Sequence, residues 1–285
     1  MSTALPSNKD LIFKDGALSL RGPAALLFRK IEQDIKKFAD VLSAEEIILS
    51  GAISFENFSR SGYLQRFPHF ANLLSTIDTN APFDLNTLKT QSLQKVCCSA
   101  VCLSCYPLFE DQLFKPSENL TLTALGHVFR KEVIDPNQIE RADEFNMREI
   151  IFFGSADFVK VQLEACISWL NQLIIDCQLQ GGVEVAEDSF FGADALDLKA
   201  YQQAVQSKFE LLLIDPKTKK KIAVASTNNH GNHFAKSYKM TFQNGDFIHT
   251  GCFGMGLERM VLLIHAQYGL DPKTWPKALQ NRFGF

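Results

Sequence analysis

Two strand-like segments joined by a polar loop constrain the fold of this chain most strongly. The segments TLTALGHVFRKE (residues 121–132) and MREIIFFGS (residues 147–155) are rich in apolar and β-branched residues, which is typical of strands. The residues between them are largely polar or acidic and include Pro136, so we expect an exposed loop there. Neighbouring strands joined in this way predict an antiparallel pair in a sheet.

Helical patterns lie on both sides of this strand pair. Residues 1–20 predict an extended or loosely packed lead-in, and a helix is expected to follow from Gly22. The periodic apolar residues of that helix are Leu27, Ile31, Ile35 and Phe38. Residues 155–179 predict the clearest helix of the chain, with Ser155 as its N-cap. The apolar face expected for this second helix consists of Phe158, Val161, Leu163, Cys166, Leu170 and Leu173.

The rest of the chain predicts more strands than helices. We expect a short strand over 183–188 and a polar helix over 193–206. Hairpins are expected over 208–229, with a lysine-rich turn, and over 236–254, with a turn at Asn244–Gly245. This order lacks the strict alternation of a doubly wound sheet, so the fold class is α+β. No repeat or linker is evident, and we expect one domain over residues 1–285.

Composition excludes several classes of protein. A net charge of −3 and a pI of about 6.1 give no broad basic surface for a nucleic-acid backbone. An odd number of cysteines, seven, does not suggest a disulfide framework in a chain of 285 residues. No secretory signal or membrane-spanning run is evident. We therefore expect a reduced, cytoplasmic protein with no membrane partner.

The stretch GCFGMGLER (residues 251–259) combines glycines, a thiol and an arginine just before an apolar helix. Glycines expose backbone N–H groups at a strand end and a helix start, where an anion is favoured, and Arg259 would add a guanidinium group. Tight packing of a strand against a helix would explain the same glycines. Arg130 and Glu132 lie two residues apart on one side of a strand, where they could contact a phosphate and an amine, or form an exposed pair.

Together these segments resemble motifs 2 and 3 of the class II aminoacyl-tRNA synthetases. The matching residues are FRKE at 129–132, a loop and second strand, and GMGLER at 254–259 leading into a helix. Further stretches are similar to the methanogen-type seryl-tRNA synthetases and to the short amino acid:[carrier protein] ligases related to them. These stretches are SGYLQRFP from Ser61, DSFFG at 188–192, KFELL from Lys208, and Ser226, Asn228, His230, His233 and Phe234. The resemblance covers roughly residues 60–270 and implies a class II synthetase-like antiparallel sheet flanked by helices.

The resemblance also assigns residues to roles. Arg130 would hold the α-phosphate of ATP and the carboxylate being activated, and Arg259 the γ-phosphate, as the catalytic residues. Phe145 would stack on adenine. The other implied ATP contacts are Glu132, Arg141, Ala142, Lys208, Ala223, Val224, Ala225 and Ser226. The implied contacts of the amino acid are Glu149, Ser226 and Asn228.

A metal site is implied as well. The resemblance places one Zn²⁺ per subunit on Cys105, Glu149 and Cys252, with an open position for the α-amino group of the substrate. From the residues alone, each cysteine could equally be a core residue. Cys102 and Cys105 have C-x₂-C spacing and could belong to a different zinc site, although no second pair completes it.

The implied activity uses ATP with Mg²⁺ to form an aminoacyl-adenylate. The acceptor would be the phosphopantetheine thiol of a small acidic carrier protein, and glycine or alanine the amino acid, with serine as the alternative. A stand-alone seryl-type core that charges tRNA is the runner-up, and a synthetase-like binding protein without chemistry is a third reading. Residues 194–208 or the lysines of 217–221 would dock the carrier, or form solvated faces. A homodimer without tRNA is expected. Mg²⁺ binding is left open, because KIAVAS (residues 221–226) lacks the acidic residue expected before Ser226.

Overall fold

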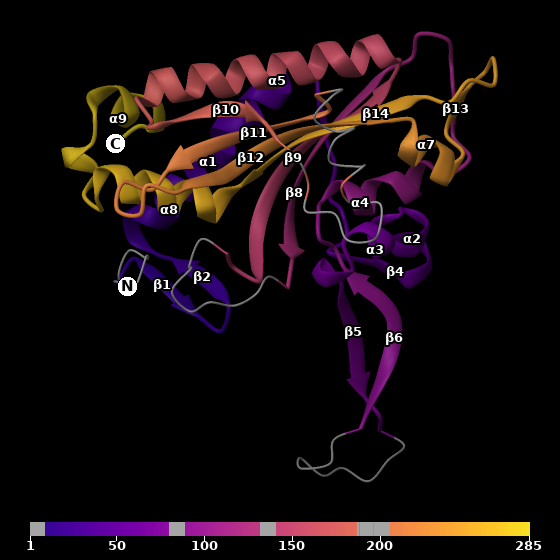
Figure 1. The fold of residues 1–285 in the computed structure, drawn as a ribbon, viewed down its shortest axis with the longest axis horizontal. Helices are drawn as coiled ribbons and strands as arrows, with labels where there is room; N and C mark the ends of the chain where they lie inside the picture. Colours follow the sequence, from indigo (N-terminus) through magenta and orange to yellow (C-terminus); the bar gives the residue numbers. More distant parts are fainter. Residues whose placement is uncertain (1–8, 80–88, 132–140, 187, 189–195, 197–205) are drawn as a thin grey trace.

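The computed structural model describes residues 9–79, 89–131, 141–186, 188, 196 and 206–285 (Figure 1). The helices are α1 (Gly22–Val41), α2 (Phe55–Arg60), α3 (Tyr63–Arg66), α4 (Cys102–Cys105), α5 (Ala156–Cys177), α7 (His233–Tyr238), α8 (Leu257–Tyr268) and α9 (Lys277–Phe283). Short 3-10 turns are η1 (Pro68–Phe70), η2 (Tyr106–Phe109) and η3 (Pro272–Thr274). In the described part of the chain, no helix combines the length and apolar character needed to span a bilayer.

The central sheet is mainly antiparallel, which confirms the α+β class. Its described strands are β1 (Leu11–Lys14), β2 (Ala17–Leu20), β3 (Glu45–Glu46), β8 (Leu120–Phe129), β9 (Glu144–Gly154), β10 (Gly181–Val185), β11 (Lys208–Ile214), β12 (Lys221–Gly231) and β14 (His249–Gly256). They follow the order β1-β2-β9-β14-β12-β11-β10, and β8 pairs with both β3 and β9. The predicted pair, β8 and β9, runs antiparallel from Leu120 opposite Phe153 to Phe129 opposite Glu144. The hairpin of β11 and β12 is also confirmed.

Alternation along the strands gives the sheet two different faces. On β9, Ile150 and Phe152 pack in a core with helices α1, α5, α8 and α9, whereas Ile151 and Phe153 belong to a second core on the other face. Neighbouring side chains of a strand point to opposite faces, so each strand contributes to both layers. In Figure 1, α5 runs along the sheet strands, and α1 and α8, which belong to the same core, overlap the strands in this view. The cavity described below opens on the face of the second core.

The long helix α5 forms as expected, and its buried face differs at one position. The Ser155 hydroxyl accepts from the Phe158 N–H and caps the helix. The prediction of Val161 on the buried face is wrong, because Val161 is 58% exposed while Val159 is fully buried. The other predicted positions are buried or partly buried. Gly251 of β14 permits the close approach of this helix, since a Cβ there would lie 2.7 Å from Val159 Cγ1.

Two other expectations need correction. Residues 11–20 form the hairpin of β1 and β2, which extends the sheet at β9, rather than a loose lead-in. The segment 236–254 turns at residues 243–246 as expected, but its first half is not one long strand. It begins inside α7 and continues as the two-residue β13 (Thr241–Phe242), which pairs with β7 (Leu113–Phe114). The predicted helix over 193–206 lies almost entirely outside the described residues.

A smaller sheet projects from the body of the molecule. Strands β4 (Ala52–Ser54), β6 (Thr90–Cys97) and β5 (Asn72–Ile77) pair in this order, and β5 and β6 form a ribbon that extends away from the central sheet (Figure 1). Only the end of β6 at Val96 and Cys97 is buried. From there the chain enters α4, which therefore begins at the junction of the two sheets.

Candidate active site

A cavity of about 630 Å³ lies on the sheet face opposite α5. Strand β9 contributes Phe145, Met147 and Glu149 to its wall, and β14 contributes Cys252, Gly254 and Gly256. Each set has the two-residue spacing of one strand face. Glu149 is opposite Gly254 in the register, and a Cβ at Gly254 would lie 3.2 Å from Glu149 Cγ. Gly254 thus leaves room for the Glu149 carboxylate. The sequence alone did not distinguish this role from exposing backbone N–H groups to an anion.

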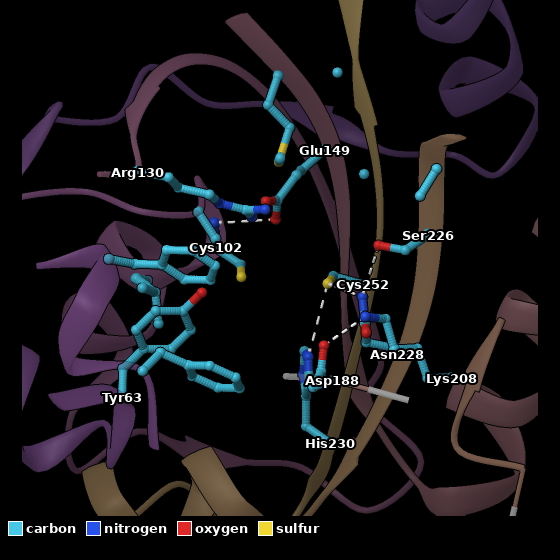
Figure 2. Close-up of a pocket in the computed structure, with 18 of the residues that line it drawn as sticks. Tyr63, Cys102, Arg130, Glu149, Asp188, Lys208, Ser226, Asn228, His230 and Cys252 are labelled. Carbon is cyan, nitrogen blue, oxygen red and sulfur yellow. Dashed lines mark hydrogen bonds and ion pairs between the residues drawn. The ribbon is translucent and has the colours of Figure 1, made fainter. Parts of the chain in front are cut away.

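The other walls come from distant parts of the chain. Strands β11 and β12 contribute Lys208, Glu210, Ser226, Asn228 and His230 (Figure 2). The segment of α3 and η1 adds a group of aromatic side chains. These are Tyr63, Phe67 and Phe70.

Two guanidinium groups lie against the ring of Phe145. The Arg130 Cζ atom is 5.6 Å from the ring centre, and the Arg259 Cζ atom is 5.8 Å from it. Arg130 also lies over Phe70, and its Nε donates to the Ser99 carbonyl at 2.8 Å. Arg259 Nη1 donates to the Ala223 carbonyl at 2.9 Å. The structure therefore brings together three residues that the sequence places in motifs 2 and 3.

Glu258 connects these two motifs. Its carboxylate accepts from the Asn146 backbone N–H at 2.9 Å and from the Asn146 side-chain amide at 2.6 Å. Burial raises the pKa of Glu258, and the bonds from Asn146 oppose that rise. Because Asn146 follows Phe145 and Glu258 precedes Arg259, this contact fixes the ring relative to the guanidinium group.

A cluster of possible metal ligands lies at the other end of the cavity. Ligand atoms of Cys102, Glu149 and Cys252 all lie within 4.8 Å of one another, and all three residues are buried. The Glu149 carboxylate accepts from the backbone N–H groups of Val101 and Cys102, each at 3.0 Å. These two groups lie at the start of α4, where the free N–H groups of a helix favour an anion. The helix start therefore orients the carboxylate toward the two thiols (Figure 2).

The charges of this cluster are strongly coupled. Burial raises the pKa of Glu149 to about 8, and the Cys252 thiolate adds to that rise. The pKa of Cys252 lies well below its usual value because the Cys102 thiol donates to it, and His230 and Asn228 add to this effect. The pKa of Cys102 is raised because its thiol donates to Cys252, and burial adds to this rise. A buried thiolate beside a buried carboxyl is an arrangement that a bound cation would stabilise.

The structure corrects the predicted ligand set at one position. Cys102, and not Cys105, lies with Glu149 and Cys252. The two cysteines are three residues apart on the single turn of α4, and Cys105 packs with Tyr106 in the second core. Burial raises the pKa of the Cys105 thiol to about 12, as expected for a core residue. The C-x₂-C spacing offered both candidates without distinguishing them.

The remaining predicted residues are distributed as follows. Seven of them line the cavity, and these are Arg141, Lys208, Ala223, Val224, Ala225, Ser226 and Asn228. Ala142 is buried and is not part of the cavity lining. Glu132 lies outside the described residues. The Asn228 amide donates to Ser226 Oγ at 3.2 Å and lies 3.7 Å from Cys252 Sγ, which links the predicted substrate contacts to the cluster.

Lys208 is the buried cation of the β11 wall. Its ammonium group forms ion pairs with Asp188 and with Glu210, the latter at 2.8 Å. Burial opposes its charge, but the two carboxylates outweigh burial and raise the pKa of Lys208. No role was predicted for Glu210, although its place two residues after Lys208 on a strand puts both on one face. Phe70 and His230 were also not assigned a role, since only the folded chain brings them to the cavity.

Comparisons with known proteins agree with this geometry. A family model described as the tRNA synthetase class II core domain (G, H, P, S and T) matches residues 94–268, more than half of the chain. The chain is 28% identical over 236 residues to "Amino acid--[acyl-carrier-protein] ligase 2" of Bradyrhizobium diazoefficiens, covering 79% of this chain and 70% of that protein. It is 25% identical over 286 residues to a "Type-2 serine--tRNA ligase" of Methanococcus maripaludis, covering 92% of this chain and 55% of that protein.

Solved structures show the same fold. M. kandleri SerRS in complex with A. aeolicus tRNASec superposes with a TM-score of 0.80 at 19% identity, over 95% of this chain and 57% of that chain. The cytoplasmic serine-tRNA ligase of Naegleria fowleri in complex with AMP gives a TM-score of 0.71 at 14% identity, over 94% and 54%. This chain thus spans little more than half of those two proteins. From the matched core model and the shared antiparallel fold, it follows that the chain belongs to the family of class II tRNA synthetase core domains.

Proposed function

We propose that this protein activates a small amino acid with ATP and transfers it to the phosphopantetheine thiol of a carrier protein. The observation that carries the proposal is a single cavity that holds two sets of residues. One is the cluster of Cys102, Glu149 and Cys252, and the other is Phe145 with its two arginines. Relatives named amino acid–[acyl-carrier-protein] ligases, 28% identical to this chain, support the same reading.

The cluster fits one Zn²⁺ ion per subunit. Two sulfur atoms and a carboxylate oxygen are usual zinc ligands, and three protein ligands leave one position open. Burial raises the pKa of the Glu149 carboxyl to about 8, and a cation bound beside it would favour its ionised form. When bound, zinc would supply a Lewis-acidic position for the neutral α-amino group of the substrate. Cys102, Glu149 and Cys252 would hold it.

The arginines serve the first chemical step. An oxygen of the substrate carboxylate attacks the α-phosphorus of ATP, an O–P bond forms, and the bond to pyrophosphate breaks. Arg130 is held by Ser99 and by two rings, so its charge is preorganised for the α-phosphate and the carboxylate. Arg259 and Phe145 bind the rest of the nucleotide, which enters with Mg²⁺. In the second step a thiol sulfur attacks the carbonyl carbon of the adenylate, and AMP leaves.

The acceptor distinguishes two candidate functions. The net charge of −3 favours a carrier over tRNA, because binding RNA requires many contacts between cations and phosphates. The similarity to type-2 serine–tRNA ligases over 92% of this chain keeps a tRNA-charging core as the alternative. Glycine or alanine is the amino acid that we expect, with serine as the competitor.

Pyrophosphate exchange across a panel of amino acids tests the first step. We expect exchange with glycine or alanine and a lower rate with serine. The purified protein should then load the labelled amino acid onto a holo-carrier and leave tRNA uncharged. Charging of tRNA without loading of any carrier would favour the alternative, and no exchange with any amino acid would contradict both.

A matched pair of cysteine variants tests the metal site. Cys102→Ala removes a proposed ligand, so zinc content and exchange should both be lost. Cys105→Ala removes a thiol from the same helical turn outside the cluster, and zinc content should stay at one per subunit. Loss of zinc in the second variant with retention in the first would refute the assignment of Cys102.

We also propose that the protein is a homodimer. Three apolar side chains of the projecting ribbon are exposed to 44–64%, which a second copy could cover. These are Leu73, Ile77 and Leu93. Light scattering coupled to size exclusion measures the mass directly, and a monomer at working concentration would contradict the proposal.

A further inference from the structure

His230 lies beside the cluster, and neither the sequence nor the proposed function gives it a role. Its Nε2 atom is 3.7 Å from Cys252 Sγ. Its Nδ1 atom is 3.2 Å from the Tyr106 hydroxyl and 3.4 Å from Thr250 Oγ1. Both ring nitrogens therefore have polar partners, and the sulfur lies on the Nε2 side (Figure 2).

The partners determine where the imidazole proton lies. A cysteine that binds a metal ion is a thiolate, which accepts hydrogen bonds and donates none. Nε2 must then carry a proton and donate it to Cys252 Sγ. Tyr106 is fully buried, burial raises the pKa of its hydroxyl, and Nδ1 is the acceptor that its proton reaches. This hydrogen bond favours the tautomer with the proton on Nε2.

The fold holds the imidazole ring in this direction. Phe234 lies edge to face with the His230 ring at 4.9 Å and stacks on Tyr106 at 4.0 Å. The pairing of β12 with β14 shifts at His230, because Asn229 is opposite Gly251 while Gly231 is opposite Thr250. His230 is thus the extra residue of a β-bulge, a feature that redirects a side chain and is frequent next to active sites.

We propose that His230 is a positioning residue of the metal site, which donates from Nε2 to the Cys252 thiolate and holds its sulfur toward Cys102 and Glu149. The proposal rests on the proposed function to the extent that the cluster holds a metal ion. His230 is not counted among the proposed ligands, since the one group of three or more mutually close ligand atoms found among the described residues is Cys102, Glu149 and Cys252. Partners of this kind orient ligands and tune the metal, and their loss typically weakens metal binding about 10–100-fold.

Two substitutions distinguish the effect of the Nε2–H donor from the effect of the packed imidazole ring. His230→Gln places an amide N–H near the position of Nε2, whereas His230→Asn reaches only the position of Nδ1. We expect the Asn variant to bind zinc about 10–100-fold more weakly in competition with a chromophoric chelator, and the Gln variant to stay within about threefold of the wild type. His249→Asn, on β14 outside the cavity, is the matched control and should leave zinc affinity unchanged.

A second readout reports on the sulfur itself. In the Co²⁺-substituted protein, the charge-transfer band from thiolate to cobalt should move to lower energy in the Asn variant and keep its position in the Gln variant. An N–H donor stabilises electrons on sulfur, and its loss makes their transfer to the metal easier. In pyrophosphate exchange, the Asn variant should raise the KM for the amino acid and leave the KM for ATP unchanged.

These measurements can overturn the inference independently of the reaction. Wild-type zinc affinity and an unshifted cobalt band in the Asn variant would refute the role of His230. Equal losses of zinc affinity in the Gln and Asn variants would refute hydrogen-bond donation to Cys252 and would indicate that His230 acts only through the packing of its ring. If the wild-type protein binds zinc but catalyses no exchange, the proposed function fails while the metal readouts still decide on His230. Circular dichroism of each metal-free variant shows whether it folds. If the Asn variant does not fold, the zinc affinity of the Gln variant is compared with that of the wild type, and a loss of more than about threefold would refute the role of the donor.

Discussion

The stability of the metal-free protein should depend on pH through Glu149. This carboxyl is 2% exposed, and burial together with the Cys252 thiolate raises its pKa from 4.5 to about 8. Between these two values the folded protein binds a proton that the unfolded chain has already released. The contribution of Glu149 to the free energy of unfolding must then fall as the pH rises through this window, whereas the lowered pKa of Cys252 acts in the opposite direction.

The size of the effect follows from the shift. One pKa unit corresponds to about 1.36 kcal/mol, so a rise from 4.5 to about 8 sets an upper limit of roughly 4–5 kcal/mol. The full contribution of Glu149 to stability is present below its unfolded pKa of 4.5, and it is lost above its folded pKa of about 8. A net stability of about 5–15 kcal/mol is typical of a domain, so a change of this size is easily measured.

Glu149→Gln removes the titration and nearly preserves the shape. The amide has one oxygen for the two N–H groups of Val101 and Cys102, so we expect a constant loss of about 1–3 kcal/mol. That loss does not vary with pH, whereas the wild-type effect does. Because Cys252 and the other titratable groups remain in both proteins, urea unfolding of the chelator-treated wild type and variant is compared at about pH 5 and about pH 8. The wild type should lose stability relative to the variant between these two pH values. An equal change with pH in both proteins would refute the reasoning.

The remaining predictions concern the nucleotide end, the buried charges and the sheet. Phe145→Leu should raise the KM for ATP about 3–30-fold with little change in the KM for the amino acid, measured by exchange, because it removes a ring worth about 0.5–2 kcal/mol. Glu32→Gln removes the carboxylate that pairs with the buried Arg148 of β9, so the free energy of unfolding in urea should fall by about 3 kcal/mol. Lys36→Met removes the exposed ion pair with Glu46 and should cost less than about 1 kcal/mol. Gly251→Ala should lose about 1–3 kcal/mol because of its contact with α5, and Gly182→Ala, where a Cβ meets nothing within 4 Å, should lose less.

Family resemblance supplied the site residues that the sequence could predict, and strand alternation explains part of their placement. Phe145 and Glu149 were assigned from the resemblance to class II synthetases, and the two-residue period places both on the cavity side of β9. Arg130 and Arg259 were assigned in the same way, and the structure brings both to Phe145. A regular strand fixes the direction of its side chains, which explains why Phe145 and Glu149 reach one cavity, and the roles assigned to the four residues stay predictions.

The proposed metal ligands could not be predicted as fully. Cys102 and Cys105 share one turn of a four-residue helix, so neither period nor spacing decides which thiol enters the cavity. The decision depends on tertiary packing: both thiols pack in the second core, but only Cys102 lines the cavity, while Cys105 is fully buried. Val161 is a different case, because helical spacing back from Leu163 leads to Val159, and a residue two positions from Leu163 does not share its face.

The stretch from Gly251 to Arg259 serves both faces of the sheet at once. Gly251 faces α5 and has no room for a side chain, while Cys252, the next residue, faces the cavity. Gly254 then leaves space for Glu149, and Glu258 binds β9 beside Phe145. The proposed metal ligands Glu149 and Cys252 and the proposed nucleotide contacts Phe145 and Arg259 are therefore positioned by the register of β9 against β14. A shift of that register by one residue would reverse both faces, so the glycines that secure helix packing also secure the site.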